Sequence, residues 1–288
     1  MKKRILNIGP VSKDYIITPH DSFTQIGGAV YYQNCALNYL NVGVKSIITI
    51  GEKDQNLLNE FYDKKQIQKI TTPQTIEYTN IYDKYNQRKQ KATLPNNPIK
   101  KEDITVNLNK YDKVILAPLC PTDIPHQTIK YLKEEGLETT LQAQGLLRQT
   151  DKNKNIIPRK WENIDKYLEN TDILCLDTSE AKQAFHTTNT HNKNMQKIVK
   201  KYKLKKLIIT QAKQGSTIHT KEKSTHILAT KATNPKDATG LGDTYIASYL
   251  TKKLENKQDI IAGLQASIIT KNKLEIKGAL KKEKSKSA

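Results

Sequence analysis

The sequence predicts an α/β fold, with a mostly parallel, doubly wound sheet and a small β lid. Short apolar runs recur along the chain, and segments with helical spacing separate many of them, which is the rhythm of parallel βαβ units. The rhythm breaks over 67–93, where a polar, strand-rich stretch is typical of an edge hairpin. Polar residues also follow several predicted strands directly, as ligand-binding residues do in such sheets.

The N-terminal part of the chain supplies the first strand–helix–strand unit. Ile5–Ile8 is an apolar run that ends at Gly9-Pro10, and it predicts a buried strand with a turn after it. Residues 30–40 have helical spacing, and 44–50 predict the next strand. Hairpins are predicted within 11–26 and within 76–91. We expect a small lid drawn from about 11–26 and 74–93, placed over a site.

The α/β rhythm resumes near Tyr111. Further strands are expected at 114–117, 138–142, 172–176, 206–210, 215–220 and 224–229, and further helices at 124–135, 161–168, 195–203, 245–254 and 260–271. Asp177-Thr-Ser-Glu180 is expected to cap one more helix. No repeat or clear linker interrupts the pattern. We therefore expect one domain over 1–280 and a disordered basic tail over 281–288.

The chain is strongly basic, with a formal net charge of +19 over 288 residues. Four of its 48 basic residues are Arg and the rest are Lys, and they are spread along the whole chain. Aromatic residues do not alternate with them, and no nucleic-acid-binding motif is present. The charge predicts weak attraction to polyanions at low salt, and no specific nucleic-acid partner.

The three cysteines, Cys35, Cys120 and Cys175, lie far apart in apolar surroundings. An odd number without paired spacing favours buried, reduced thiols over a disulfide framework or a zinc site. The apolar run after Lys2-Lys3-Arg4 is too short for a signal peptide or a membrane span. We expect a soluble, cytoplasmic protein that has no membrane partner.

One stretch carries the clearest chemistry. Asp237-Ala-Thr-Gly-Leu-Gly-Asp243 is a turn of small residues that leads directly into the predicted helix 245–254. Free backbone N–H groups and the helix dipole make such a helix start a site for anions, above all phosphates. A carboxylate there suits a base that takes a proton from a hydroxyl attacking the phosphate. The alternative is an ordinary capped junction between a loop and a helix.

Asp237–Asp243 also resembles the Asp-x-Thr-Gly-x-Gly-Asp signature of the ribokinase-like (PfkB) carbohydrate kinases. The resemblance extends from about Ile5 to Gly278. Further matching segments are the Gly-Gly signature at 26–32, the lid hairpin at 80–88, the mid-chain segments at 116–125 and 143–148, Glu180 of the Asn-x-x-Glu motif, and the nucleotide loop at 208–216. The resemblance implies a ribokinase-like three-layer fold with a mostly parallel central sheet and a small β lid.

The resemblance implies transfer of the γ-phosphoryl group of ATP to a hydroxyl of a sugar or related polyol. Asp243 would be the catalytic base, and Gly240, Leu241 and Gly242 would form the anion hole. Substrate-binding residues would be Asp14, Gly27, Gly28, Tyr32, Arg88 and Gln144. Nucleotide-binding residues would be Thr210, Gly215, Asp237 and Thr239. Glu180, and Asp177 indirectly, would be linked to the Mg²⁺ that accompanies ATP. A monovalent cation and a homodimer through the lid are further options.

The chain departs from the family pattern at three positions. Asp177 replaces the Asn of Asn-x-x-Glu, Ala212 replaces the first Gly of the nucleotide loop, and Tyr32 stands where sugar kinases commonly have Asn. Two alternative functions follow. One is a nucleoside kinase with the same chemistry and a different acceptor. The other, favoured by Ala212 and Asp177, is a catalytically silent protein that binds a nucleotide or polyanion as a regulator.

Overall fold

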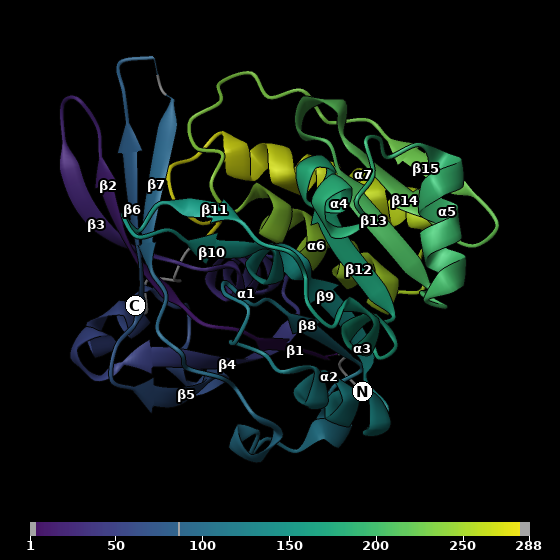
Figure 1. Cartoon of the computed structure of the whole chain (residues 1–288), viewed down its shortest axis with the longest axis horizontal. Helices are drawn as coiled ribbons and strands as arrows, with labels where there is room; N and C mark the ends of the chain where they lie inside the picture. Colours follow the sequence, from purple (N-terminus) through teal and green to yellow (C-terminus); the bar gives the residue numbers. More distant parts are fainter. Residues whose placement is uncertain (1–3, 86, 283–288) are drawn as a thin grey trace, which may run out of the picture.

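The computed structural model describes residues 4–85 and 87–282, so most of the predicted tail lies outside the described residues. Its centre is a nine-stranded sheet (Figure 1). In spatial order the strands are β15 (Ser224–Ile227), β14 (Ser216–His219), β13 (Lys206–Thr210), β12 (Ile173–Asp177), β9 (Glu138–Gln142), β8 (Lys113–Leu116), β1 (Arg4–Ile8), β4 (Gly43–Gly51) and β5 (Ile67–Thr72). The sheet is parallel from β13 to β5, and β14 and β15 are antiparallel.

Helices cover both faces of this sheet and make three layers. One face carries α1 (Ala29–Tyr39), α6 (Leu241–Leu254) and α7 (Asp259–Leu274), and the other carries α2 (His126–Glu134), α3 (Ile164–Leu168), α4 (Thr178–Ala184) and α5 (Asn192–Lys201). Alternate side chains of β1 enter different cores: Ile5 packs with α6 and α7, and Leu6 packs with α2. The predicted three-layer α/β fold is confirmed.

A second, four-stranded sheet has the order β3 (Ser22–Gly27), β2 (Ser12–Ile17), β6 (Ile76–Tyr82) and β7 (Arg88–Thr93). Figure 1 shows it at the left of the view, beside the helical layers. The two hairpins are joined by parallel pairing of β2 with β6. A short hairpin of β10 (Arg148–Thr150) and β11 (Ile156–Pro158) bonds to β7 through the Lys91–Asn155 bridge. The small β lid of the predicted fold class is therefore present.

Several elements differ from the predictions. Ile67–Thr72 does not begin the break in the rhythm, because it pairs in parallel with β4 at the edge of the main sheet. The helix predicted over 161–168 begins only at Ile164, because Asn163 adopts a left-handed conformation with φ 57°. Trp161 instead packs against Tyr167, with the ring centroids 5.8 Å apart. The helix predicted from Ile124 begins at His126, after Pro125.

The five-residue turn between β13 and β14 contains Ala212, one of the three departures from the family pattern. Its φ of 48° is in the left-handed region, where glycine has no steric cost and alanine loses about 1 kcal/mol. Gly215 closes the turn with φ 98°, and a Cβ there would lie 2.0 Å from the Ile227 carbonyl oxygen. The turn therefore forms with alanine at position 212 and requires glycine at 215.

All three cysteines are free and buried, as expected. Within the described part of the chain, no helix is both long and apolar enough to cross a membrane.

Candidate active site at the start of helix α6

Helix α6 begins with the geometry of an anion-binding site. Gly240 is its N-cap, in a left-handed conformation with φ 75°. The first intrahelical bond is donated by Thr244 to the Gly240 carbonyl, at 2.9 Å. The amides of Leu241, Gly242 and Asp243 precede it and have no acceptor within the helix. Three backbone donors and the positive end of the helix dipole thus meet at one point.

Asp243 lies in the first turn of α6, and a residue of the main sheet holds its carboxylate in place. Its Oδ1 accepts a hydrogen bond of 3.0 Å from Nε2 of Gln142, the last residue of β9. The Gln142 Oε1 in turn accepts a hydrogen bond from Gln33 of α1. Burial raises the pKa of Asp243 to about 6, although the Gln142 bond and the charge of Arg148 lower it. The carboxylate is oriented and still mostly ionised at neutral pH.

A second buried carboxylate, Asp14, lies on β2 where the lid joins the main sheet. Its Oδ1 accepts a 2.7 Å hydrogen bond from the Ser12 hydroxyl, and only 6% of the residue is exposed. A Cβ on Gly27 would lie 2.3 Å from the Asp14 Oδ2, so a larger residue there would displace the Asp14 carboxylate. Burial raises the pKa of Asp14 to about 6, against the Ser12 bond and the positive charge of Arg88.

Tyr32 of α1 links the two carboxylates. Its ring lies against Gly240, where a Cβ would come within 2.3 Å of the Tyr32 Cδ1. Burial raises the pKa of the Tyr32 phenol, and the negative charges of Asp14, Asp237 and Asp243 raise it further. All three carboxyl groups therefore act electrostatically on one phenol. The structure brings these predicted site residues into one region, although Asp14 and Tyr32 are more than 200 positions from Asp237 and Asp243 in the chain.

A sequence profile described as pfkB family carbohydrate kinase matches residues 120–269, which is more than half of the chain. The chain belongs to the PfkB family of carbohydrate kinases. It is thus a phosphotransferase that acts on an alcohol group. No match was found among curated proteins.

Solved structures similar to this PfkB kinase support the same fold. A pyrophosphate-dependent kinase of the ribokinase family is 22% identical with a TM-score of 0.82, covering 96% of this chain and 97% of that one. Ribokinase from Thermotoga maritima is 18% identical with a TM-score of 0.76, covering 96% and 94%. A nucleoside kinase from Burkholderia thailandensis, in complex with inosine, is 18% identical with a TM-score of 0.76, covering 96% and 92%. At these identities the likeness shows the fold alone.

Glu180 and Asp177 of the PfkB kinase form a capping box at the start of α4. The Asp177 Oδ1 accepts from the Glu180 N–H at 2.7 Å, and the Glu180 Oε2 accepts from the Asp177 N–H at 2.9 Å. Burial raises the pKa of Glu180, and the charge of Asp177 raises it further. Gln144 donates to the Glu180 Oε1 at 3.0 Å. Asp177 caps the helix as the Asn of the family motif could, so this departure preserves the local structure.

The nucleotide-binding candidates fall into two places. Asp237 and Thr239 lie just before the anion hole, where the Asp237 Oδ1 accepts from the Thr239 N–H at 2.9 Å. Thr210 and Gly215 lie at the turn between β13 and β14. Thr210 is in register with Asp177 on the neighbouring β12, so this turn is next to the capping box. The assignment of these residues to a nucleotide remains a prediction.

Sequence reasoning missed Gln33, Gln142 and Arg148. The signal for Gln142 was present, because it ends a predicted strand, but Gln144 was selected from the same segment. Arg148 lies in a segment that resembles the family and had no assigned role. Its positive charge lowers the pKa of both Asp243 and Glu180.

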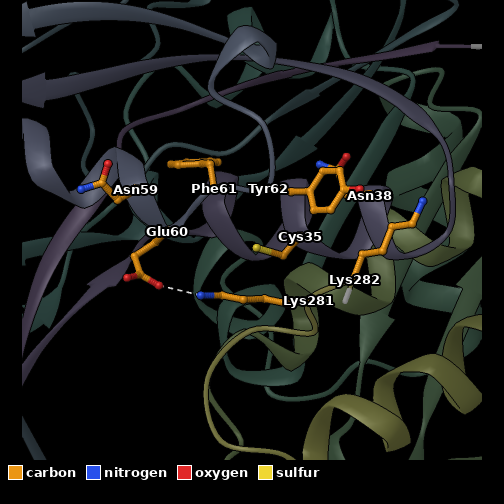
Figure 2. Close-up of a pocket in the computed structure, with 8 residues that line it drawn as sticks. All are labelled: Cys35, Asn38, Asn59, Glu60, Phe61, Tyr62, Lys281 and Lys282. Atoms are coloured by element: carbon orange, nitrogen blue, oxygen red, sulfur yellow. Dashed lines mark hydrogen bonds and ion pairs between the residues drawn. The ribbon is translucent and has the colours of Figure 1, made fainter. Parts of the chain in front are cut away.

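Two cavities lie away from these residues. Figure 2 shows one of about 70 Å³, which is lined by Cys35 and by the ion pair of Lys281 with Glu60. Another of about 290 Å³ is lined by residues that include Cys120, Thr122 and Arg159. Neither is lined by a predicted site residue. Among the described residues, no group of three His, Cys, Asp or Glu could hold a metal ion.

Removing the Gln142 amide should raise the pKa of Asp243. Gln142→Leu deletes the donor to Oδ1, so less stabilisation of the carboxylate remains and its pKa should rise above about 6. Gln144→Leu is the matched control, because Gln144 bonds to Glu180 instead. Carboxyl ¹³C NMR titration, with the Asp243 signal assigned by substitution, measures the pKa of Asp243 in both variants. An unchanged Asp243 pKa in Gln142→Leu would contradict the described geometry.

Proposed function

We propose that this PfkB kinase transfers the γ-phosphoryl group of ATP to a hydroxyl of a sugar or related polyol, with Asp243 as the base. One observation carries the proposal. An oriented carboxylate, with its pKa raised to about 6, occupies the same helical turn as three free backbone amides. A proton acceptor and a phosphate cradle are the two parts that in-line phosphoryl transfer requires side by side.

In the proposed reaction the acceptor hydroxyl approaches between Asp243 and the transferred phosphoryl group. Asp243 takes the hydroxyl proton as the oxygen attacks phosphorus and the bond to the leaving phosphate breaks. The amides of Leu241, Gly242 and Asp243 donate to the phosphoryl oxygens as charge shifts during transfer. Each such donor contributes about 3 kcal/mol in comparable sites. Gln142 keeps the Asp243 carboxylate aimed throughout.

The acceptor is proposed to bind between the lid and α1. Asp14 is a buried hydrogen-bond acceptor suited to hydroxyl groups, and Gly27 allows a close approach to it. Arg88 adds a positive charge from the lid strand β7. Tyr32 presents a neutral phenol whose pKa is raised by burial and by the negative charges of Asp14, Asp237 and Asp243. These polar groups support a sugar or polyol acceptor.

The divalent cation is proposed to bind mainly through the donor. Magnesium commonly keeps one or two protein carboxylates, several waters and substrate phosphates as ligands, so the described residues fit without a three-residue cluster. Glu180, with Asp177 acting indirectly, is the proposed protein contribution. When bound, Mg²⁺ neutralises charge on the phosphates. Arg148 would balance the remaining negative charge of Glu180 and Asp243.

The lid is proposed to form a homodimer contact. Ile17 and Phe23 are 40% and 47% exposed on the β2–β3 hairpin, and β3 is an edge of the second sheet. Exposed apolar side chains at a strand edge favour pairing with another chain.

Asp243→Asn should lower kcat by about 100-fold or more, because the amide cannot accept the proton. The fold should persist, since Asn can occupy the same space beside Gln142. ADP release measures turnover, and thermal unfolding with circular dichroism checks the fold. Asp165→Asn, on the exposed surface of α3, is the control that should keep full activity. Undiminished turnover in Asp243→Asn would contradict the assignment of Asp243 as the base.

A panel that crosses ATP and pyrophosphate with sugars, inositols and nucleosides tests the donor and the acceptor. We expect turnover with ATP and with at least one sugar or polyol. Pyrophosphate is the alternative donor, favoured by the similarity to a pyrophosphate-dependent kinase at a TM-score of 0.82. Turnover with pyrophosphate and not with ATP would contradict ATP as the donor. Turnover with nucleosides and not with sugars or polyols would contradict the proposed acceptor class. Nucleotide binding without any turnover would support a regulatory protein instead.

A further inference from the structure

A fully buried lysine contacts the loop that leads to the anion hole. It has no part in the proposed phosphoryl transfer. Lys273, in the last turn of α7, is 0% exposed. Its Nζ donates to the Asp237 carbonyl oxygen at 2.9 Å and to the Asp237 Oδ2 at 3.2 Å. A lysine is rarely buried completely unless its ammonium is paired, so this one has a specific partner in the loop before α6.

The same contact joins the loop to the end of α7. The N–H groups of Lys236 and Asp237 donate to the Leu274 carbonyl, at 2.7 and 3.2 Å. The Asp237 Oδ2 also accepts from the Gly278 N–H at 3.0 Å. Asp237 therefore connects α7, the segment after it and the loop that leads to Gly240. Lys273 is the positive charge at the centre of this junction.

The junction continues to the anion hole through Tyr32. The Lys273 Nζ lies 6.0 Å from the centroid of the Tyr32 ring, and the Tyr32 ring lies against Gly240. Gly240 is the N-cap that precedes the three free amides. A shift of the loop or of the ring would thus move the donors that are proposed to hold the phosphoryl group.

We infer that Lys273 is a positioning residue, a built-in cation that fixes the anion-hole loop so that the kinase needs no free monovalent cation. The inference rests on the proposed function for its effect on turnover. Two oxygens of Asp237, one carbonyl and one carboxylate, converge on the ammonium. Hard alkali cations seek such oxygens, and here Lys273 already holds them. The monovalent cation considered from the resemblance is therefore not expected.

The kinetic test compares Lys273→Met with Lys271→Met. Both remove one positive charge from the last turn of α7, but Lys271 pairs with Glu275 and does not contact Asp237. In buffer whose only monovalent cations are Tris and tetramethylammonium, wild-type kcat should equal that measured with added KCl. Lys273→Met should lose about 100-fold in kcat with little change in acceptor KM, because the donors are misplaced. Lys271→Met should behave as the wild type.

Chemical rescue distinguishes two roles of the Lys273 ammonium: it could position the loop, or it could only stabilise the fold. Lys273→Ala leaves space beside Asp237, so added ammonium or methylammonium should restore part of its kcat and leave the wild type unaffected. Dependence of the wild type on K⁺ would overturn the inference. So would wild-type kcat in Lys273→Met without added ammonium.

A binding measurement keeps this inference separate from the proposed function. Sulfate should stabilise the wild type and Lys271→Met against thermal unfolding, because it fits the anion hole, and should stabilise Lys273→Met much less. Circular dichroism checks that each variant is folded. If the wild type turns over no acceptor, the proposed function fails. The sulfate measurement then still tests whether Lys273 positions the anion-hole loop. Equal stabilisation of Lys273→Met by sulfate would overturn the role of Lys273.

Discussion

The hydrogen bond between Gln142 and Asp243 is the contact on which the proposed catalytic geometry depends. It ties the first turn of α6 to the carboxyl end of β9, a central strand of the sheet. Backbone amides alone would make α6 a phosphate-binding helix. The bond from the sheet aims the carboxylate, and burial raises its pKa to about 6, close enough to neutrality for a base. In the proposed reaction the helix thus supplies the amides that bind phosphate, and the sheet orients the base.

A second constraint brings the lid and the helices to the same place. Tyr32 packs on Gly240, and burial and the negative charges of Asp14, Asp237 and Asp243 raise the pKa of its phenol. Asp14 belongs to the lid sheet, and Asp237 is held by the buried Lys273 at the end of α7. The proposed acceptor side and the proposed phosphate side of the site therefore both lie next to one aromatic ring. Substitution of Tyr32 would disturb both sides at once.

Much of the site could be predicted because local sequence encodes it. The 237–243 turn has the glycines and the carboxylate that a helix start with this chemistry requires, and Asp14 and Gly27-Gly28 follow or precede predicted elements directly. The capping box of Asp177 and Glu180 is likewise a local pattern. The three-layer order follows from the alternation of strands and helices.

The parts that could not be predicted depend on pairing between distant positions. Gln142 and Asp243 are 101 residues apart, and Lys273 and Asp237 are 36 apart. A lysine in a basic chain gives no sign that it will be buried. Ile67–Thr72 has the polar composition of an edge hairpin. Its membership of the main sheet follows only from its parallel pairing with β4, which the sequence does not show. Asn163 delays the start of the predicted helix to Ile164 through its left-handed backbone conformation, which no periodicity reveals.

The pH dependence of kcat/KM for the unmodified enzyme tests the central claim most directly. Asp243 must be ionised to accept the proton, and its pKa and that of Asp14 are both raised to about 6. We predict a constant kcat/KM above neutrality and a fall below pH 6 that approaches about tenfold per pH unit, or a steeper fall where Asp14 must also be ionised. A kcat/KM that stays constant down to pH 5, with the fold intact, would contradict the assignment of Asp243 as the base.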